Sequence, residues 1–213
     1  LTISHGSKIE NVVTGSGNDT VIGTDFDNVI STGSGSDTIF AGGGADTIKS
    51  GTGADRIDLS ESVQMRDTVK LTVPSSDLGV DILYGFSQGV LGDILDVSEI
   101  LSPVSEMFPL VISGFAPTAN FGGGILRLVG PDVSNVADLV GAFQVGGGLD
   151  TLSISNSEKA IIISADSQNT GENQFMFSVE SHGEEVFVME LAIFEGNALD
   201  IDQWHADNFN VIA

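Results

Sequence analysis

Nine-residue blocks tile the chain without a gap from Thr14 to Asp58. The five blocks read TGSGNDTVI, GTDFDNVIS, TGSGSDTIF, AGGGADTIK and SGTGADRID. A fixed period gives each block the same local structure, so the blocks are expected to stack as coils that bury a shared core. This repeat restricts the first quarter of the chain to a solenoid-like architecture.

Three kinds of residue recur at fixed positions within the blocks. Glycine occupies positions two and four, aspartate occupies position six, and an aliphatic residue occupies position eight. The glycines and aspartates are Gly15, Gly17, Asp19, Gly33, Gly35, Asp37, Gly42, Gly44, Asp46, Gly51, Gly53 and Asp55. The second block departs from the pattern, because Thr24 and Phe26 replace the two glycines and Asn28 replaces the aspartate. A degenerate block, HGSKIENVV, precedes the five.

Each block is predicted to form a six-residue turn and a three-residue strand. Glycine permits positive φ in the turn and lets carbonyl groups point into a shared cavity, while the aliphatic residue of the strand faces inward. Two blocks complete one coil, so residues 18 apart stack. This geometry places Asp19, Asp37 and Asp55 in one column and Glu10, Asn28 and Asp46 in the opposite column.

The charge balance points to a bound cation. Seven Lys and Arg against 30 Asp and Glu give a net charge of −23, which opposes compaction and makes nucleic acid and anionic membranes poor partners. The absence of Cys excludes disulfides and thiolate metal sites. Stacked carboxylates and turn carbonyls can supply the roughly six to eight oxygens that Ca²⁺ takes. We therefore predict Ca²⁺ as the cofactor, bound better by the Asp19 column than by the column with the uncharged Asn28.

The blocks resemble the RTX (repeat-in-toxin) nonapeptide, glycine-glycine-x-glycine-x-aspartate-x-aliphatic-x, which binds Ca²⁺ in a parallel β-roll. The resemblance implies that the block glycines, the block aspartates and Asn28 are the metal-binding residues. Residues 14–48 look particularly like the roll that follows the catalytic domain in serralysin-type proteases. The competing interpretation is a flexible Gly/Ser/Asp linker, which would not need an inward aliphatic residue at a fixed phase.

The nine-residue phase is lost after Asp58, and short β-rich runs follow. They are DTVKLTV, VDILY, GDILDV, GILRLVG, TLSIS, AIIIS, QFMFSVE and EEVFVMELAIF. Alternation in Gln174–Glu195 predicts a hairpin with its turn at Ser181–Glu184. One helix is predicted at Asn135–Phe143, with Ser134 as its N-cap. The predicted fold is all-β: a parallel β-roll over residues 1–60, followed by a β-sandwich or extended β-roll over residues 61–213.

Two later stretches resemble export sequences. Val80–Leu101 is similar to the segment that follows the repeats in type I secretion target domains. Ala160–Ala213 contains no Lys or Arg and is similar to the uncleaved C-terminal signals of that route, although a solvated acidic face would look alike. The resemblance implies a secreted or cell-surface protein that binds calcium ions and engages the type I secretion machinery. We expect a fragment of a longer exoprotein, whose activity, for example a serralysin-like metalloprotease, lies upstream of Leu1.

Two other classes of function stay open at this point. A calcium-dependent anchoring or assembly module of an S-layer protein or adhesin would have the same repeats. An enzyme would have to use Ser87, because Gly85–Gly89 matches the nucleophile-elbow pattern. No α/β alternation surrounds that stretch, so we predict an ordinary turn there and no catalytic residue in this chain.

The remaining candidate metal ligands are weaker. His5, His182 and His205 are too scattered in the sequence to predict a zinc site. Asp25–Asp27 and Asp200–Asp202 look like calcium loops but lack the glycine and terminal glutamate of an EF-hand, so solvated turns are the favoured interpretation. No apolar run approaches the roughly 18 residues of a membrane span, and no membrane insertion is expected.

Overall fold

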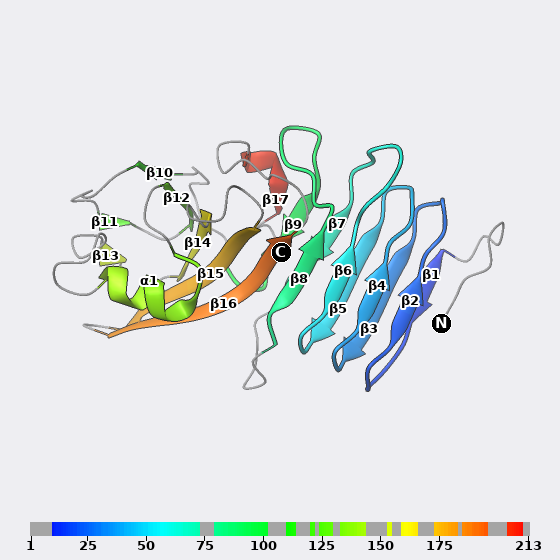
Figure 1. Cartoon of the computed structure of the whole chain (residues 1–213), viewed down its shortest axis with the longest axis horizontal. Coiled ribbons are helices and arrows are strands. Elements are labelled where there is room, and N and C mark those ends of the chain that lie inside the picture. Colours follow the sequence, from blue (N-terminus) through cyan, green and yellow to red (C-terminus); the bar gives the residue numbers. More distant parts are fainter. Residues whose placement is uncertain are drawn as a thin grey trace.

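The chain folds into a stack of parallel strands that continues into a mixed sheet with one helix (Figure 1). The computed structural model describes residues 10–72, 79–101, 110–113, 120–121, 124–129, 133–143, 153–154, 159–165, 173–182, 185–195 and 204–210. The N-terminal strands lie at one end of the stack and the helix lies at the other (Figure 1). The all-β class that the sequence predicts is therefore confirmed.

Two sheets face each other in the roll. One sheet is entirely parallel and contains, in spatial order, β1 (Asn11–Val13), β3 (Val29–Ser34), β5 (Thr47–Thr52), β7 (Thr68–Lys70), β9 (Ile94–Asp96) and β17 (Phe209–Asn210). The facing strands are β2 (Thr20–Ile22), β4 (Thr38–Phe40), β6 (Arg56–Asp58) and β8 (Asp81–Tyr84), also parallel. The chain alternates between the two sheets, as a coil of two blocks requires.

Consecutive coils pair with the 18-residue step that the sequence predicts. Val29 pairs with Thr47 in one sheet, and Thr20 pairs with Thr38 in the other. The aliphatic residue of each block is at most 1% exposed between the sheets; these residues are Val21, Ile30, Ile39, Ile48 and Ile57. Burying each of them contributes about 1.5–3 kcal/mol relative to exposure, so the hydrophobic stripe stabilises the coiled state.

The parallel ladder does not stop where the blocks stop. The pairing step lengthens to 21 residues between Thr47 and Thr68, and to 26 residues between Arg56 and Ile82. Val69, Leu83 and Leu95 extend the buried stripe. Longer turns between the strands therefore break the nine-residue phase, while the coils continue to β9. Whether residues 1–60 and 61–213 form separate domains stays a prediction.

The second region extends the sheet of β8 without a break. Its strands, in spatial order away from β8, are β16 (Glu185–Glu195), β15 (Asn173–His182), β14 (Lys159–Ala165), β12 (Gly124–Val129) and β10 (Leu110–Ser113). β15 and β16 form the predicted antiparallel hairpin, in which His182 pairs with Glu185 and residues 183–184 of the predicted turn lie outside the described residues. A separate short pair joins β11 (Asn120–Phe121) to β13 (Ser153–Ile154).

The single α-helix among the described residues, α1 (Val136–Phe143), forms where the sequence predicts a helix. The prediction of Ser134 as its N-cap is wrong. The Asp138 backbone N–H donates to Asn135 Oδ1 at 3.0 Å, so Asn135 is the capping residue. Ser134 instead donates its backbone N–H and its hydroxyl to the Asp138 carboxylate. No helix in the described part of the chain is long and apolar enough to cross a membrane.

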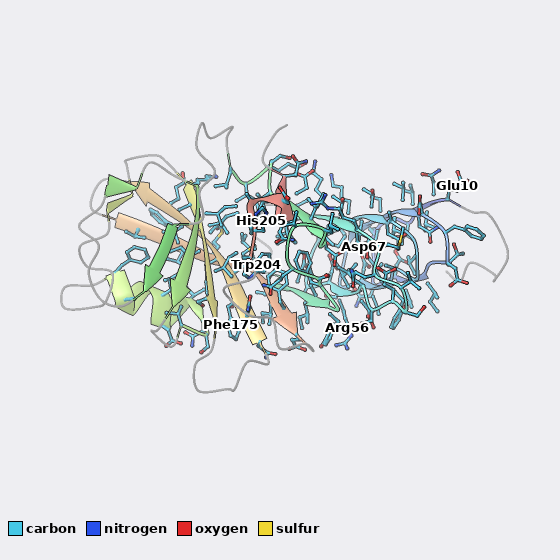
Figure 2. All side chains as sticks on the ribbon, turned by 90° about the horizontal axis from the view of Figure 1, so that it is seen from above. Glu10, Arg56, Asp67, Phe175, Trp204 and His205 are labelled. Atoms are coloured by element: carbon cyan, nitrogen blue, oxygen red, sulfur yellow. The ribbon has the colours of Figure 1, made fainter. Side chains whose placement is uncertain are left out.

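Aromatic side chains join the last coils to the second region. Trp204 lies 5.3 Å from Phe86, 5.2 Å from Phe194 and 5.3 Å from Phe209 between ring centroids. Trp204 is labelled at this junction in Figure 2. The segment Trp204–Asn210 thus contacts β16 and also adds β17 beside β9, which closes the end of the roll.

Candidate metal centre

The block aspartates form a continuous hydrogen-bonded column on one side of the roll. Each backbone N–H donates to the carboxylate one coil further on: Asp19 to Asp37 Oδ1 at 2.8 Å, and Asp37 to Asp55 Oδ1 at 2.8 Å. The column continues from Asp55 to Asp81 Oδ1 at 3.1 Å. The predicted stacking of the Asp19 column is therefore confirmed, and Asp81 extends it.

A second column runs along the opposite side. The Asn28 N–H donates to Asp46 Oδ1 at 2.7 Å, Asp46 to Asp67 Oδ1 at 2.8 Å, and Asp67 to Asp93 Oδ1 at 2.9 Å. At its start, the Val29 N–H donates to the Glu10 carbonyl at 2.6 Å, so Glu10 lies one coil before Asn28 as expected. Asp67, labelled in Figure 2, belongs to the roll and not to the second region.

Sequence reasoning missed Asp67, Asp81 and Asp93 as column members. The signal that could have found them is short: an aspartate followed two residues later by a buried aliphatic residue. Asp-Thr-Val begins at Asp67, and Asp-Ile-Leu begins at both Asp81 and Asp93. The same spacing ends the nonapeptide blocks, so it marks a coil even where the glycines are lost.

The second oxygen of three block aspartates is buried without a hydrogen-bond partner among the described residues. These atoms are Oδ2 of Asp37, Asp46 and Asp55, on side chains that are each 1% exposed. An ionised oxygen without a partner in a protein interior is costly, and a bound cation is one of the few ways to compensate it. The residues present therefore fit a hard divalent ion on both sides of the roll.

Burial also changes the acid strength of the columns. Desolvation by burial, with the nearby carboxylates, raises the pKa of Asp46 to about 7 and of Asp81 to about 7. The same causes raise the pKa of Asp67 to about 8, and burial raises that of Asp93 to about 6. A divalent cation beside these groups would favour the ionised form instead. Calcium and protons therefore compete for the columns.

At Gly51 and Gly53 the glycine turns stack too closely for a side chain. A Cβ on Gly51 would lie 1.8 Å from the Gly33 carbonyl oxygen, and Gly51 has φ +102°. Gly53 stands in the same relation to Gly35, with 2.0 Å between the added Cβ and the carbonyl oxygen. Gly15 differs, because nothing lies within 4 Å of a Cβ there and its φ is not in the left-handed region. The turns thus bring backbone carbonyls of successive coils together, as the repeat predicts.

The second block, which departs from the repeat pattern, still forms a coil, but it places Asn28 in the column instead of an aspartate. Asn28 Oδ1 accepts the Thr24 backbone N–H at 2.8 Å, so its amide is directed at its own turn. Asp27 Oδ1 accepts the Ala45 N–H at 2.8 Å in the next turn. Whether Asn28 is also a metal ligand, as the resemblance implies, stays a prediction. Asp25 and Asp27 line an open cleft with a volume of about 1090 Å³ on this side.

The other candidates from the sequence are Ser87, the three histidines and Asp200–Asp202. Ser87 lies in the turn after β8, and its backbone N–H donates to Asp93 Oδ2 at 2.7 Å. His182 lies in β15, and His205 Nδ1 accepts the Asp207 N–H at the short helix η2 (Ala206–Asn208). His5 and Asp200–Asp202 lie outside the described residues. No group of three or more His, Cys, Asp or Glu side chains able to hold a metal occurs in the described part, so backbone oxygens must complete any site.

The stacked coils, the paired carboxylate columns and the glycine turns define a cation-binding parallel β-roll. Residues 13–48 and 22–57 match the family described as the RTX calcium-binding nonapeptide repeat (4 copies). Residues 13–57 of this chain are therefore RTX repeats, and Ca²⁺ is their cofactor. RTX repeats are calcium-binding rather than catalytic elements, and proteins that contain them are typically extracellular.

Two solved structures to which this chain is similar are subunits of one enzyme. The solution structure of the AlgE6R2 subunit from the Azotobacter vinelandii mannuronan C5-epimerase is 18% identical, with 95% of this chain and 93% of that chain covered and a TM-score of 0.50. The AlgE6R3 subunit of the same enzyme is 17% identical over 92% and 79% of the two chains, with a TM-score of 0.49. These likenesses concern the fold alone. No curated protein matches the sequence.

Proposed function

We propose that this chain is a calcium-dependent folding module of an exported protein, which folds on Ca²⁺ binding outside the cell. The observation that carries the proposal is the set of buried carboxylate oxygens without partners on Asp37, Asp46 and Asp55. In this proposal the metal ligands are the block glycine carbonyls, the block aspartates and Asn28, as the RTX resemblance implies.

The driving force of the proposed switch is thermodynamic linkage. A ligand that binds the folded state alone stabilises it by RT ln(1 + [Ca²⁺]/Kd) per site, about 1.4 kcal/mol for each tenfold excess. Dissociation constants on the order of 10⁻⁴–10⁻³ M, usual for extracellular calcium modules, would leave the roll unfolded in a calcium-poor cytoplasm. The net charge of −23 adds to this dependence, because it opposes compaction until cations bind.

The proposal includes export of the unfolded chain by type I secretion, with the signal in the acidic C-terminal region. The position of the segment Trp204–Asn210 supports this order of events. In the folded chain Trp204 is 3% exposed and Phe209 is paired with Leu95 of β9. Once folded, this segment is no longer available to a transporter, so export would have to precede calcium binding.

The proposal is tested by calcium titration of the whole chain, followed by far-ultraviolet circular dichroism and by fluorescence of Trp204, the only tryptophan. We expect strand content and a blue-shifted emission to appear together between about 0.1 and 1 mM Ca²⁺, and EGTA to reverse both. Mg²⁺ is the control and should be much weaker, because it demands a small octahedral site. Strand content unchanged by EGTA would reject the proposal.

Calcium-dependent assembly, as in an S-layer protein or adhesin, is the second candidate. β1 and β2 are the end strands of the two sheets among the described residues, so a further coil of another molecule could add beside them by parallel pairing. Light scattering during the same titration distinguishes the two candidates. Growth of particles with Ca²⁺ would favour assembly, whereas a folded monomer would favour the folding module.

A further inference from the structure

We propose that the turn Leu59–Arg66, which lies outside the nonapeptide repeats, completes the calcium site of the fourth block, in which Glu61 acts together with Asp46. The inference rests on the proposed calcium-dependent function and adds to it a ligand that no repeat contains. It also assigns a role to the turn that lengthens the coil after the last block.

The first observation is a pair of unpaired buried oxygens. Glu61 Oε2 and Asp46 Oδ2 are both buried without a hydrogen-bond partner in the part of the chain that the structure describes. Asp46 is 1% exposed and belongs to the glycine turn of the fourth block. Glu61 lies close enough to Asp46 and Asp67 for its charge to interact with theirs. Glu61 is therefore unlike a glutamate that points into solvent.

The second observation is how the turn holds Glu61. The step from Asp46 to Asp67 in the column spans 21 residues, three more than a pair of blocks. Within the extra length, the Met65 backbone N–H donates to Glu61 Oε1. One carboxylate oxygen thus fastens the turn, and the other stays available. This division resembles that of the block aspartates, whose Oδ1 joins the coils while Oδ2 has no partner.

The third observation is that a nearby cationic side chain is engaged elsewhere. Arg66, at the end of the same turn, donates from Nε to the Gly92 carbonyl at 2.9 Å and from Nη2 to the Asp207 carbonyl at 2.7 Å. Within the described ranges, Asp46, Glu61 and Asp67 form no ion pair with a basic side chain. The negative charge at this position is therefore left for an ion from solution to balance.

The surroundings suit calcium in particular. Glu61 lines the open cleft of about 1090 Å³ together with the turn Gly42–Gly44, so an ion can reach it and find backbone carbonyls nearby. Two carboxylates, carbonyl oxygens and water are the ligands that Ca²⁺ accepts in irregular geometry, whereas Mg²⁺ requires a near-ideal octahedron. Some of the calcium ligands would come from a repeat, and the others would come from the turn that follows the repeats.

The experiment compares calcium binding by the whole chain with that of the variant E61Q, using equilibrium dialysis with ⁴⁵Ca and isothermal titration calorimetry. Glutamine keeps an oxygen that can accept the Met65 N–H, so a purely structural role of Glu61 predicts no change. We expect E61Q to bind one Ca²⁺ fewer per chain, or to weaken one site by roughly tenfold or more through the lost ligand charge. The matched control is E99Q, because Glu99 is partly exposed and paired with Lys70 at 3.0 Å.

Three outcomes separate the two proposals. An E61Q chain with the stoichiometry and affinities of the original overturns the Glu61 site and leaves the calcium-dependent folding intact. An original chain that binds no Ca²⁺ overturns the proposed function itself. If E61Q does not reach the circular dichroism of the original chain at saturating Ca²⁺, the variant E61D decides: binding with full stoichiometry but lower affinity supports the site, and failure to fold overturns it.

Discussion

The coils built from nonapeptide blocks and the coils that follow them share one hydrogen-bond ladder but differ at the second carboxylate oxygen. In the blocks, Oδ2 of Asp37, Asp46 and Asp55 has no partner among the described residues. In the later coils, Asp93 Oδ2 accepts the Ser87 N–H at 2.7 Å, and Asp81 Oδ2 accepts the Ser50 hydroxyl at 3.4 Å. The ladder alone therefore does not create a need for calcium.

This difference at the second carboxylate oxygen indicates which coils of the fold depend on calcium. A coil whose aspartate finds two protein donors is complete without an ion, because both buried oxygens are hydrogen-bonded. A coil with short glycine turns brings carbonyls, not donors, to the carboxylate, and it must recruit a cation. The glycine turns thus determine the metal requirement, and the aspartate ladder determines the stacking.

The largest effect should appear on calcium removal, and it should be uneven along the chain. In EGTA we expect amide protection in β2–β5 to fall by about 100-fold or more, because unpaired buried carboxylates destabilise those coils. Protection in β15 and β16 should fall by less than about tenfold, since their hydrogen bonds need no ion. Hydrogen exchange read by mass spectrometry measures both. Equal loss in both regions would remove the distinction between the two kinds of coil.

A second effect concerns pH in the absence of calcium. Burial raises the pKa of Asp67 to about 8 and of Asp46 to about 7, above the ordinary 3.8 of an unfolded chain. Between pH 4 and pH 8 the calcium-free folded chain therefore binds more protons than the unfolded chain, and its stability must fall as pH rises. With calcium bound the folded carboxylates are ionised, as they are in the unfolded chain over this interval, so stability should change little with pH.

Circular dichroism of the calcium-free chain and denaturant titrations of the calcium-bound chain, each at pH 5 and pH 8, check this difference. The calcium-free chain should have more strand content at pH 5, and the calcium-bound midpoint should change little between the two pH values. The second-region helix α1 offers an internal reference, because no carboxylate column lies in it. A calcium-free chain that is more stable at pH 8 would contradict the assignment of the raised pKa values to the folded columns.

The sequence predicts the coils of this fold only where the residues that define a coil recur at a fixed spacing. The coils of Thr14–Asp58 are predictable because each block repeats its glycine, aspartate and aliphatic residue at a fixed distance. The later coils are not, since turns of variable length change the step from 18 to 21 and 26 residues and destroy the period. Only the aspartate and its aliphatic neighbour survive there, and two residues are a weak signal.

The site is less predictable than the fold, for a similar reason. Glu61 lies in a turn rich in polar residues, and nothing in the sequence distinguishes it from a solvated glutamate; only its buried Oε2 does so. Ser87, by contrast, lies in a sequence pattern typical of a catalytic nucleophile, yet its backbone N–H donates a hydrogen bond to the Asp93 carboxylate. The N-cap that the sequence predicts for α1, Ser134, lies one residue before the observed N-cap, Asn135. Ser and Asn have similar capping preferences, and the local geometry selects Asn135.

Paired amide substitutions would sharpen the comparison between the two kinds of coil. In D37N the amide keeps the acceptor for the Asp19 N–H and replaces the unpaired oxygen, so the chain should bind fewer calcium ions at saturation. In D93N the amide faces two donors, Asp67 N–H and Ser87 N–H, with one oxygen. We expect D93N to keep the full calcium stoichiometry and lose about 1–3 kcal/mol of stability at saturating calcium.

Equilibrium dialysis with ⁴⁵Ca and urea unfolding in excess calcium give the two quantities. The comparison fails if D93N loses calcium as D37N does, because Asp93 would then be a ligand and not a hydrogen-bonded substitute for one. It also fails if D37N retains the full stoichiometry. Either result would change which coils are assigned to the calcium-binding kind and which to the hydrogen-bonded kind.

The smallest effect tests whether the roll and the second region fold as one unit. Replacing the N-cap residue, as in N135A, should cost about 1 kcal/mol, since the Asp138 N–H loses its acceptor. If both regions unfold in one transition, linkage requires that this local cost also raise the calcium concentration at the folding midpoint, up to about fivefold if a single calcium ion is linked to folding and less if several are. If the chain divides near residue 60 into independent domains, the midpoint of the roll stays unchanged while α1 melts earlier. Calcium titrations of N135A and of N135S, in which serine keeps an N-cap acceptor, distinguish these outcomes, and the protection expected to remain in β15 and β16 without calcium leads us to expect the independent one.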